Sequence, residues 1–138
     1  RETFQPDAAQ ALVTLRSVLL MALHKGGAPI VLGSDAPQFF NVPGFSIHRE
    51  MAMMQAAGMT PYEVLVTGTR NAAQALGTPA AFGTVEVGRR ADLVLLAGDP
   101  REDLSHAQMP LGVMARGRWW PREALDARLA EIAERHAE

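Results

Sequence analysis

Residues 28–35, which read APIVLGSD, decide the fold of this sequence. The first five form a short apolar run that alternates poorly and is bounded by glycines. A run of this kind is typical of a strand in a parallel sheet or barrel, because such strands are buried on both faces. We therefore predict a buried parallel strand at 29–33, with Asp35 at its carboxyl end.

The segment before this strand has the pattern of a helix. Apolar residues recur at helical spacing between Leu12 and Leu23, which produces one apolar stripe. Lys25 and the pair Gly26-Gly27 supply a cation in the last turn and a left-handed cap. A helix, a glycine pair and a buried strand in this order are typical of an α/β repeat.

The segment after the strand predicts a loop and then more helices. Residues 60–63 read TPYE, a strong helix start, because Thr60 can cap, Pro61 fits the first turn and Glu63 can complete a capping box. We expect a loop at 36–45 and helices at 47–57, 60–69 and 71–76.

The pattern changes near Pro79, where β-type segments replace helical ones. Alternating or apolar runs are bounded by turn residues such as Gly98-Asp99-Pro100. The last segment carries apolar residues on one side at helical spacing. We expect strands at 82–87 and 91–97, a short hairpin or two short strands at 113–120 and a terminal amphipathic helix at 121–138.

Composition limits the function. The 138 residues are 48% hydrophobic and 20% charged, as in globular proteins. The net charge of −2 argues against a nucleic-acid partner, and apolar runs such as 91–97 are too short to span a bilayer. The absence of cysteine excludes thiolate chemistry and fits a reducing compartment, which favours the cytoplasm. Because Arg1 is not a start residue, we expect the sequence to open within a longer protein.

Two residues are candidates for a functional site. Asp35 stands at a strand end, where α/β proteins build active sites, and its carboxylate could ligate a metal or accept a proton from water. The alternative is a local turn or cap role. His48, near the start of the helix after the loop, could bind substrate or could only hydrogen-bond locally.

Several motifs together resemble one known family. Residues 31–35 (VLGSD) resemble the eighth-strand signature of the amidohydrolase superfamily. Further segments are similar, in the same order, to its imidazolonepropionase-like and prolidase-like members: 44–50 (GFSIHRE), 60–65 (TPYEVL), 69–73 (TRNAA), 76–77 (LG), 83–94 (GTVEVGRRADLV), 98–100 (GDP) and 113–117 (VMARG). The resemblance covers nearly the whole chain.

The resemblance implies an α/β fold, the C-terminal part of a metal-dependent (β/α)8 (TIM) barrel with part of a small β-sandwich and a C-terminal helix. It divides the chain into a barrel segment at 1–78, part of a composite β-sandwich at 79–120 and the helix at 121–138. It implies one or two divalent metals, usually zinc, and a metal-activated water that attacks a carbonyl or amidine-like carbon. Asp35 would be the metal ligand and catalytic base, and His48 would contact substrate.

The other ligands of that family, a His-x-His on the first strand, a bridging lysine or glutamate and two later histidines, have no counterpart in this sequence. A catalytic zinc needs about three protein ligands. We therefore expect a hydrolase of C–N bonds, acting on a small cyclic amide or a dipeptide, that is inactive without an N-terminal barrel part. That part, or self-association, would cover the exposed strand edges. The alternative is a non-catalytic module with a structural or interaction role.

Overall fold

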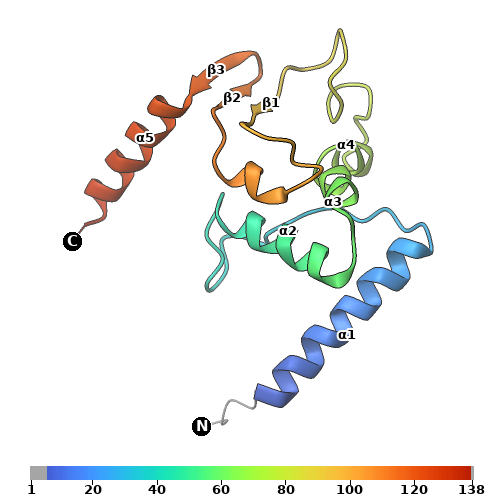
Figure 1. The fold of residues 1–138 in the computed structure, drawn as a ribbon. Helices are drawn as coiled ribbons and strands as arrows, with labels where there is room; N and C mark the ends of the chain where they lie inside the picture. The colour runs from blue at the N-terminus through green and yellow to red at the C-terminus, as the bar shows by residue number, and fades with distance from the viewer. Residues whose placement is uncertain (1–5, 138) are drawn as a thin grey trace.

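The structure, a computed structural model, describes residues 6–137. The described residues form two parts, a group of helices around α2 and α3 and a small sheet followed by a terminal helix (Figure 1). In chain order the elements are α1 (Pro6–Lys25), α2 (Ser46–Ala57), α3 (Pro61–Gly68), α4 (Arg70–Ala75), β1 (Leu93–Leu95), the 3-10 helix η1 (Leu104–Gln108), β2 (Gly112–Ala115), β3 (Arg118–Pro121) and α5 (Arg122–Arg135). The predicted helices are confirmed to within a few residues at their ends.

The core lies where α2, α3 and η1 meet. Its buried apolar side chains come from all three elements and from the turn between α2 and α3: Met51, Met54, Met59, Val64 and Leu104. Ile30 and Leu32 from the extended segment pack against this cluster and are partly buried. The core therefore fixes the base of the segment that carries Asp35.

The predicted strand at 29–33 is not a paired strand in the structure. A strand is defined by backbone bonds to a neighbouring strand, and within residues 6–137 no strand lies beside this segment. Helices hold it instead: the Leu32 N–H donates to the Thr67 carbonyl at 3.3 Å, and the Asn71 side-chain amide donates to the Ile30 carbonyl at 2.9 Å. The barrel strand at 29–33 therefore stays a prediction, because its pairing strands would lie outside the described residues.

The sheet has three antiparallel strands in the order β1-β2-β3. The hairpin between β2 and β3 turns through Arg116 and Gly117, which have φ of 50° and 81°. Two consecutive positive φ values are what a two-residue hairpin turn requires. The hairpin predicted at 113–120 is confirmed, and the strand predicted at 91–97 is shorter, since only β1 is paired.

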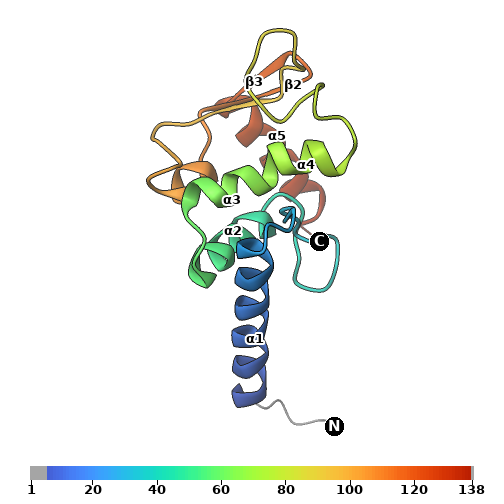
Figure 2. The ribbon, with the colours of Figure 1, turned by 90° about the vertical axis from the view of Figure 1, so that its right-hand side faces the viewer.

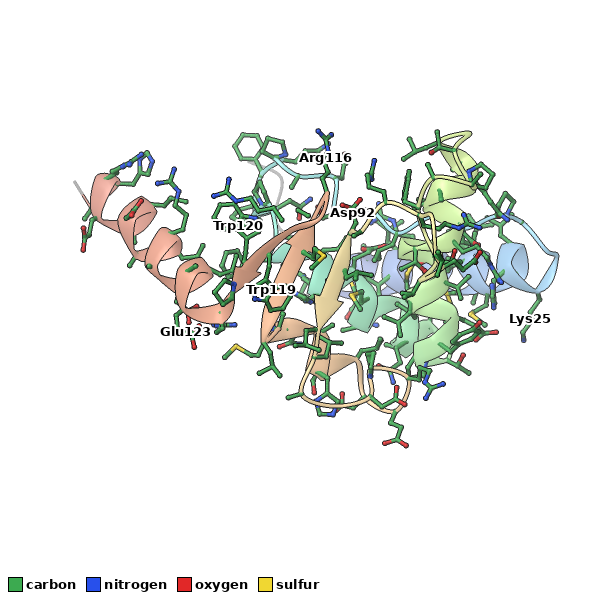
Figure 3. The ribbon with its side chains drawn as sticks, turned by 90° about the horizontal axis from the view of Figure 1, so that it is seen from above. Lys25, Asp92, Arg116, Trp119, Trp120 and Glu123 are labelled. Carbon is green, nitrogen blue, oxygen red and sulfur yellow. The ribbon has the colours of Figure 1, made fainter. Side chains whose placement is uncertain are left out.

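Residues 82–87, for which a strand is predicted, are unpaired, and Val85 and Val87 are largely exposed, because within the described chain they have no strand to pair with. Trp119, labelled in Figure 3, is 43% exposed, and its ring lies against Gly112. A Cβ at position 112 would collide with that ring, so any larger residue there would displace Trp119.

Both end helices are largely uncovered. Figure 2 shows α1 extending away from the other helices, and Figure 1 shows the same for α5. Neither helix has a buried residue. The accessible surface is 10382 Å², whereas a compact monomer of this mass exposes about 7,000 Å². The shape is therefore far more open than that of an isolated globular domain.

Helix α1 also changes one expectation from the sequence. It is long and apolar enough to cross a membrane by length and composition, with a mean hydropathy of 1.2 and no part of that window buried. Helices from the cores of globular proteins meet the same criterion, as do signal sequences. The expectation that no apolar segment has spanning length is thus wrong for residues 6–25.

The capping box predicted at 60–63 is present, and its hydrogen bonds favour the ionised carboxylate of Glu63 in the folded state. The Thr60 N–H donates to the Glu63 carboxylate at 2.7 Å, and His24 lies 3.0 Å from its other oxygen. These bonds, first that from the Thr60 backbone, lower the pKa of Glu63 to about 2. The bond to His24 also ties the end of α1 to α3.

We expect Glu63→Gln to destabilise the complete protein at neutral pH by roughly 1 kcal/mol or less, because the pair is partly exposed. Because the folded-state pKa lies below the unfolded value of 4.5, this contribution is complete above the unfolded pKa and is lost as pH falls toward about 2. Urea unfolding of both forms between about pH 7 and about pH 3 measures it. A difference that does not shrink at low pH, or an equal one for Glu102→Gln, would contradict the assignment.

Candidate functional site

Asp35 stands where the extended segment leaves the helical core. The residues before it pack on α3 and α4, and the loop 36–45 after it leads to α2 (Figure 1). Asp35 has a φ of 53°, in the left-handed region that few non-glycine residues adopt. Its side chain is exposed. The sharp backbone turn at Asp35 thus presents an accessible carboxylate at the end of a segment fixed by the core.

One neighbour holds this carboxylate. The Gln38 side-chain amide donates to Oδ2 of Asp35 at 2.7 Å. Within residues 6–137, no side chain or backbone group bonds the second oxygen, Oδ1. One oxygen is therefore oriented and the other can meet a ligand.

The loop that carries Gln38 is closed by its own hydrogen bonds. The Asn41 N–H donates to the Gln38 carbonyl at 2.9 Å. The Val42 N–H donates to Oγ of Ser46 at 2.8 Å, while the Ser46 N–H donates back to the Val42 carbonyl at 3.0 Å. The side chain of Ser46 therefore serves the loop, and α2 has no side-chain cap.

His48 lies in the first turn of α2 and does not share a site with Asp35. Its half-buried ring lines a groove of about 760 Å³ between α2, η1 and α5, together with apolar side chains such as Phe45, Met109 and Leu125. Nδ1 of His48 is buried and has no hydrogen-bond partner among the described residues. Asp35 does not line this groove, so the structure does not bring the two predicted site residues together.

A bound metal would need several carboxylate, imidazole or thiolate ligands close together. Among the residues that the structure describes, no three His, Asp, Glu or Cys side chains gather as a cation site would need. Asp35 by itself fits one position of such a site, since its carboxylate is exposed and has an oxygen that accepts no bond from the described chain. The chain can therefore contribute one ligand and cannot form a complete metal centre within residues 6–137.

Sequence reasoning missed Gln38 as a member of this site. Its only cue was a polar side chain three residues after Asp35, a spacing that is frequent in loops. The contact depends on the left-handed backbone at Asp35 and on the turn at 38–41, neither of which a residue pattern predicts.

Asp35 is an exposed aspartate that follows a core-packed extended segment between helices. Proteins of the α/β class place functional groups at the ends of such segments. The amidohydrolase family model matches residues 5–120. The chain therefore belongs to the amidohydrolase family, and the resemblance stated from the sequence is confirmed.

Individual relatives agree with this assignment. The chain is 38% identical over 86 residues to an imidazolonepropionase of Pseudomonas savastanoi pv. phaseolicola, covering 62% of this chain and 21% of the relative. A putative prolidase from Bifidobacterium longum superposes with a TM-score of 0.68 at 35% identity, over 81% of this chain and 29% of that one. An Xaa-Pro dipeptidase superposes with a TM-score of 0.69 at 26% identity, over 76% and 25%.

These neighbours place the chain in the TIM-barrel superfamily fold. They also set its extent, because the chain spans only about a fifth to three tenths of the length of these relatives.

Proposed function

We propose that this chain is the C-terminal part of a metal-dependent amidohydrolase that cleaves a C–N bond with an activated water. The observation that carries the proposal is the exposed carboxylate of Asp35 at the end of the extended segment, inside the part of the chain that matches the family. The barrel segment would be 1–78, the share of a composite β-sandwich 79–120, and the closing helix 121–138.

Asp35 would have two tasks in the reaction. A divalent metal such as zinc, when bound, lowers the pKa of water so that it attacks at neutral pH. The Oδ1 atom of Asp35 would supply one ligand to that metal and accept the proton of the attacking water. Asp35 would then deliver this proton to the leaving nitrogen, so that it acts first as a general base and then as a general acid.

The substrate would be either a small cyclic amide or a dipeptide. The relatives support both, since one is named an imidazolonepropionase and two are named a dipeptidase or prolidase. A substrate contact of His48 stays a prediction: its ring lines the groove beside α5, which Asp35 does not line, so a substrate cleaved at Asp35 would have to extend into that groove to reach it.

The open surface supports a partner that completes the barrel. Helix α1 exposes apolar side chains along its length, among them Leu15 at 63% and Val18 at 62%. Such a surface is costly in water at about 25 cal/mol per Å². We propose that the N-terminal part of the barrel covers it, whether in the same polypeptide or as a second chain, and that the chain self-associates when that part is withheld.

A second function, a non-catalytic interaction module, has one observation in its favour. No group of three metal-binding side chains gathers within residues 6–137, so these residues have no metal centre of their own. The exposed apolar face would then bind another protein and Asp35 would only shape its loop.

The complete protein that carries this chain separates the two functions. We expect it to contain about one or two divalent metal ions per chain by elemental analysis and to hydrolyse a cyclic amide or a dipeptide. Removing the metal with a chelator should abolish hydrolysis, and adding zinc should restore it. A complete protein that binds no metal and cleaves neither substrate class would exclude the hydrolase and leave the interaction module.

A further inference from the structure

We propose that Gln38 is a positioning residue that orients the Asp35 carboxylate, so that Oδ2 is held by the protein and Oδ1 is presented to the metal and the attacking water. The proposal rests on the proposed function. It assigns a role to a residue that neither the sequence motifs nor the family match singles out.

The geometry of the contact is the first argument. The Gln38 amide donates to Oδ2 at 2.7 Å, at the short end of the range for N–H···O bonds, as expected for a bond to an ionised acceptor. An exposed aspartate without such a bond would exchange among several rotamers. The Gln38 bond selects one of them.

The second argument is that the backbone of Gln38 is held in a closed turn. Its carbonyl accepts the Asn41 N–H at 2.9 Å, which closes a turn at 38–41. The start of α2 fixes the far side of the loop through the bonds between Val42 and Ser46. The side-chain amide is therefore presented to Asp35 from a closed turn.

The chemistry of the donor is the third argument. A carboxylate that binds a metal through one oxygen is commonly hydrogen-bonded through the other, which fixes its direction. A neutral amide does this without cancelling the negative charge, whereas a lysine or arginine at position 38 would compete with the metal for it. Glutamine thus orients Asp35 and leaves its charge available.

The turn and the side chain can be separated by mutation. The turn uses the backbone carbonyl of Gln38, so its side chain can change while the turn remains. Gln38→Met keeps the length of the side chain and removes the donor. Gln38→Glu keeps length and polarity but places a second carboxylate against Asp35. Gln10→Met, at an exposed position of α1, is the matched control.

The experiment measures two quantities in the complete enzyme: zinc affinity by chelator competition, and kcat and KM with the substrate found for the wild type. We expect Gln38→Met to weaken zinc binding or lower kcat by about 10- to 100-fold with little change in KM. Gln38→Glu also removes the donor, so kcat should fall at least as far as in Gln38→Met. Gln10→Met should match the wild type, and thermal midpoints should agree for all.

Zinc affinity and kcat unchanged in Gln38→Met would overturn the proposal, provided that Asp35→Asn is inactive in the same assay. A fully active Asp35→Asn enzyme would instead overturn the proposed function and this inference with it. An equal loss in Gln10→Met, or a loss that follows the thermal midpoint, would reduce Gln38 to a structural role and also contradict the proposal.

Discussion

In the complete enzyme, Asp35→Asn is expected to lower kcat/KM by about 10²- to 10⁴-fold, the usual worth of a positioned general base. The amide of asparagine has nearly the shape of the carboxylate, so the loop should keep its fold. It carries no charge and cannot accept the water proton, so both tasks proposed for Asp35 fail together. Steady-state kinetics and zinc content of the purified variant measure the two losses separately.

Asp7→Asn is the matched control for this substitution. Asp7 is also exposed and lies in the first turn of α1, where losing its charge costs at most a fraction of the stability of one helix end. We expect its activity and zinc content to equal those of the wild type. If Asp35→Asn kept both at the wild-type level, the proposed role of Asp35 and the hydrolase mechanism would be wrong.

Met54→Ala should have the largest effect on stability. Met54 is 3% exposed, and its sulfur lies 3.9 Å from the hydroxyl of the buried Thr67. Truncation removes buried methylenes and leaves a cavity between α2 and α3, which costs about 2–5 kcal/mol. Chemical denaturation of the complete protein measures the change in free energy of unfolding.

The adjacent Met53 provides the control, because it is 44% exposed on the same helix. Met53→Ala changes helix propensity in the same way and removes little buried surface, so a change below about 0.5 kcal/mol is expected. Equal losses in the two variants would show that the core between α2 and α3 does not exist as described. That result would also remove the support for the segment that carries Asp35.

Local signals predicted the helices well because their causes lie within a few residues. The start of α3 is set by Thr60, Pro61 and Glu63, and the structure contains that capping box in full. The end of α2 at Gly58 follows from a glycine with a φ of 120°, a left-handed cap. The hairpin between β2 and β3 likewise depends on two turn residues.

Strands were predicted less well because their causes are distant. The runs at 29–33 and 82–87 have strand-like composition, yet neither is paired among the described residues. Composition indicates only that a segment could bury both faces or alternate between a buried and an exposed face. Whether it pairs depends on a neighbouring strand, which the composition does not specify. The position of Trp119 against Gly112 likewise depends on the register between β2 and β3.

The sequence by itself determined the family, the positions of the helices and the candidate Asp35, since ordered motifs and local capping carry that information. Only the tertiary structure decided that Gln38 holds the Asp35 carboxylate, that His48 faces a separate groove and that α1 stands uncovered. These facts depend on the left-handed backbone at Asp35 and on which surfaces meet across the fold. Residue patterns do not encode such contacts, because they join groups whose distance is set by the packing of whole elements.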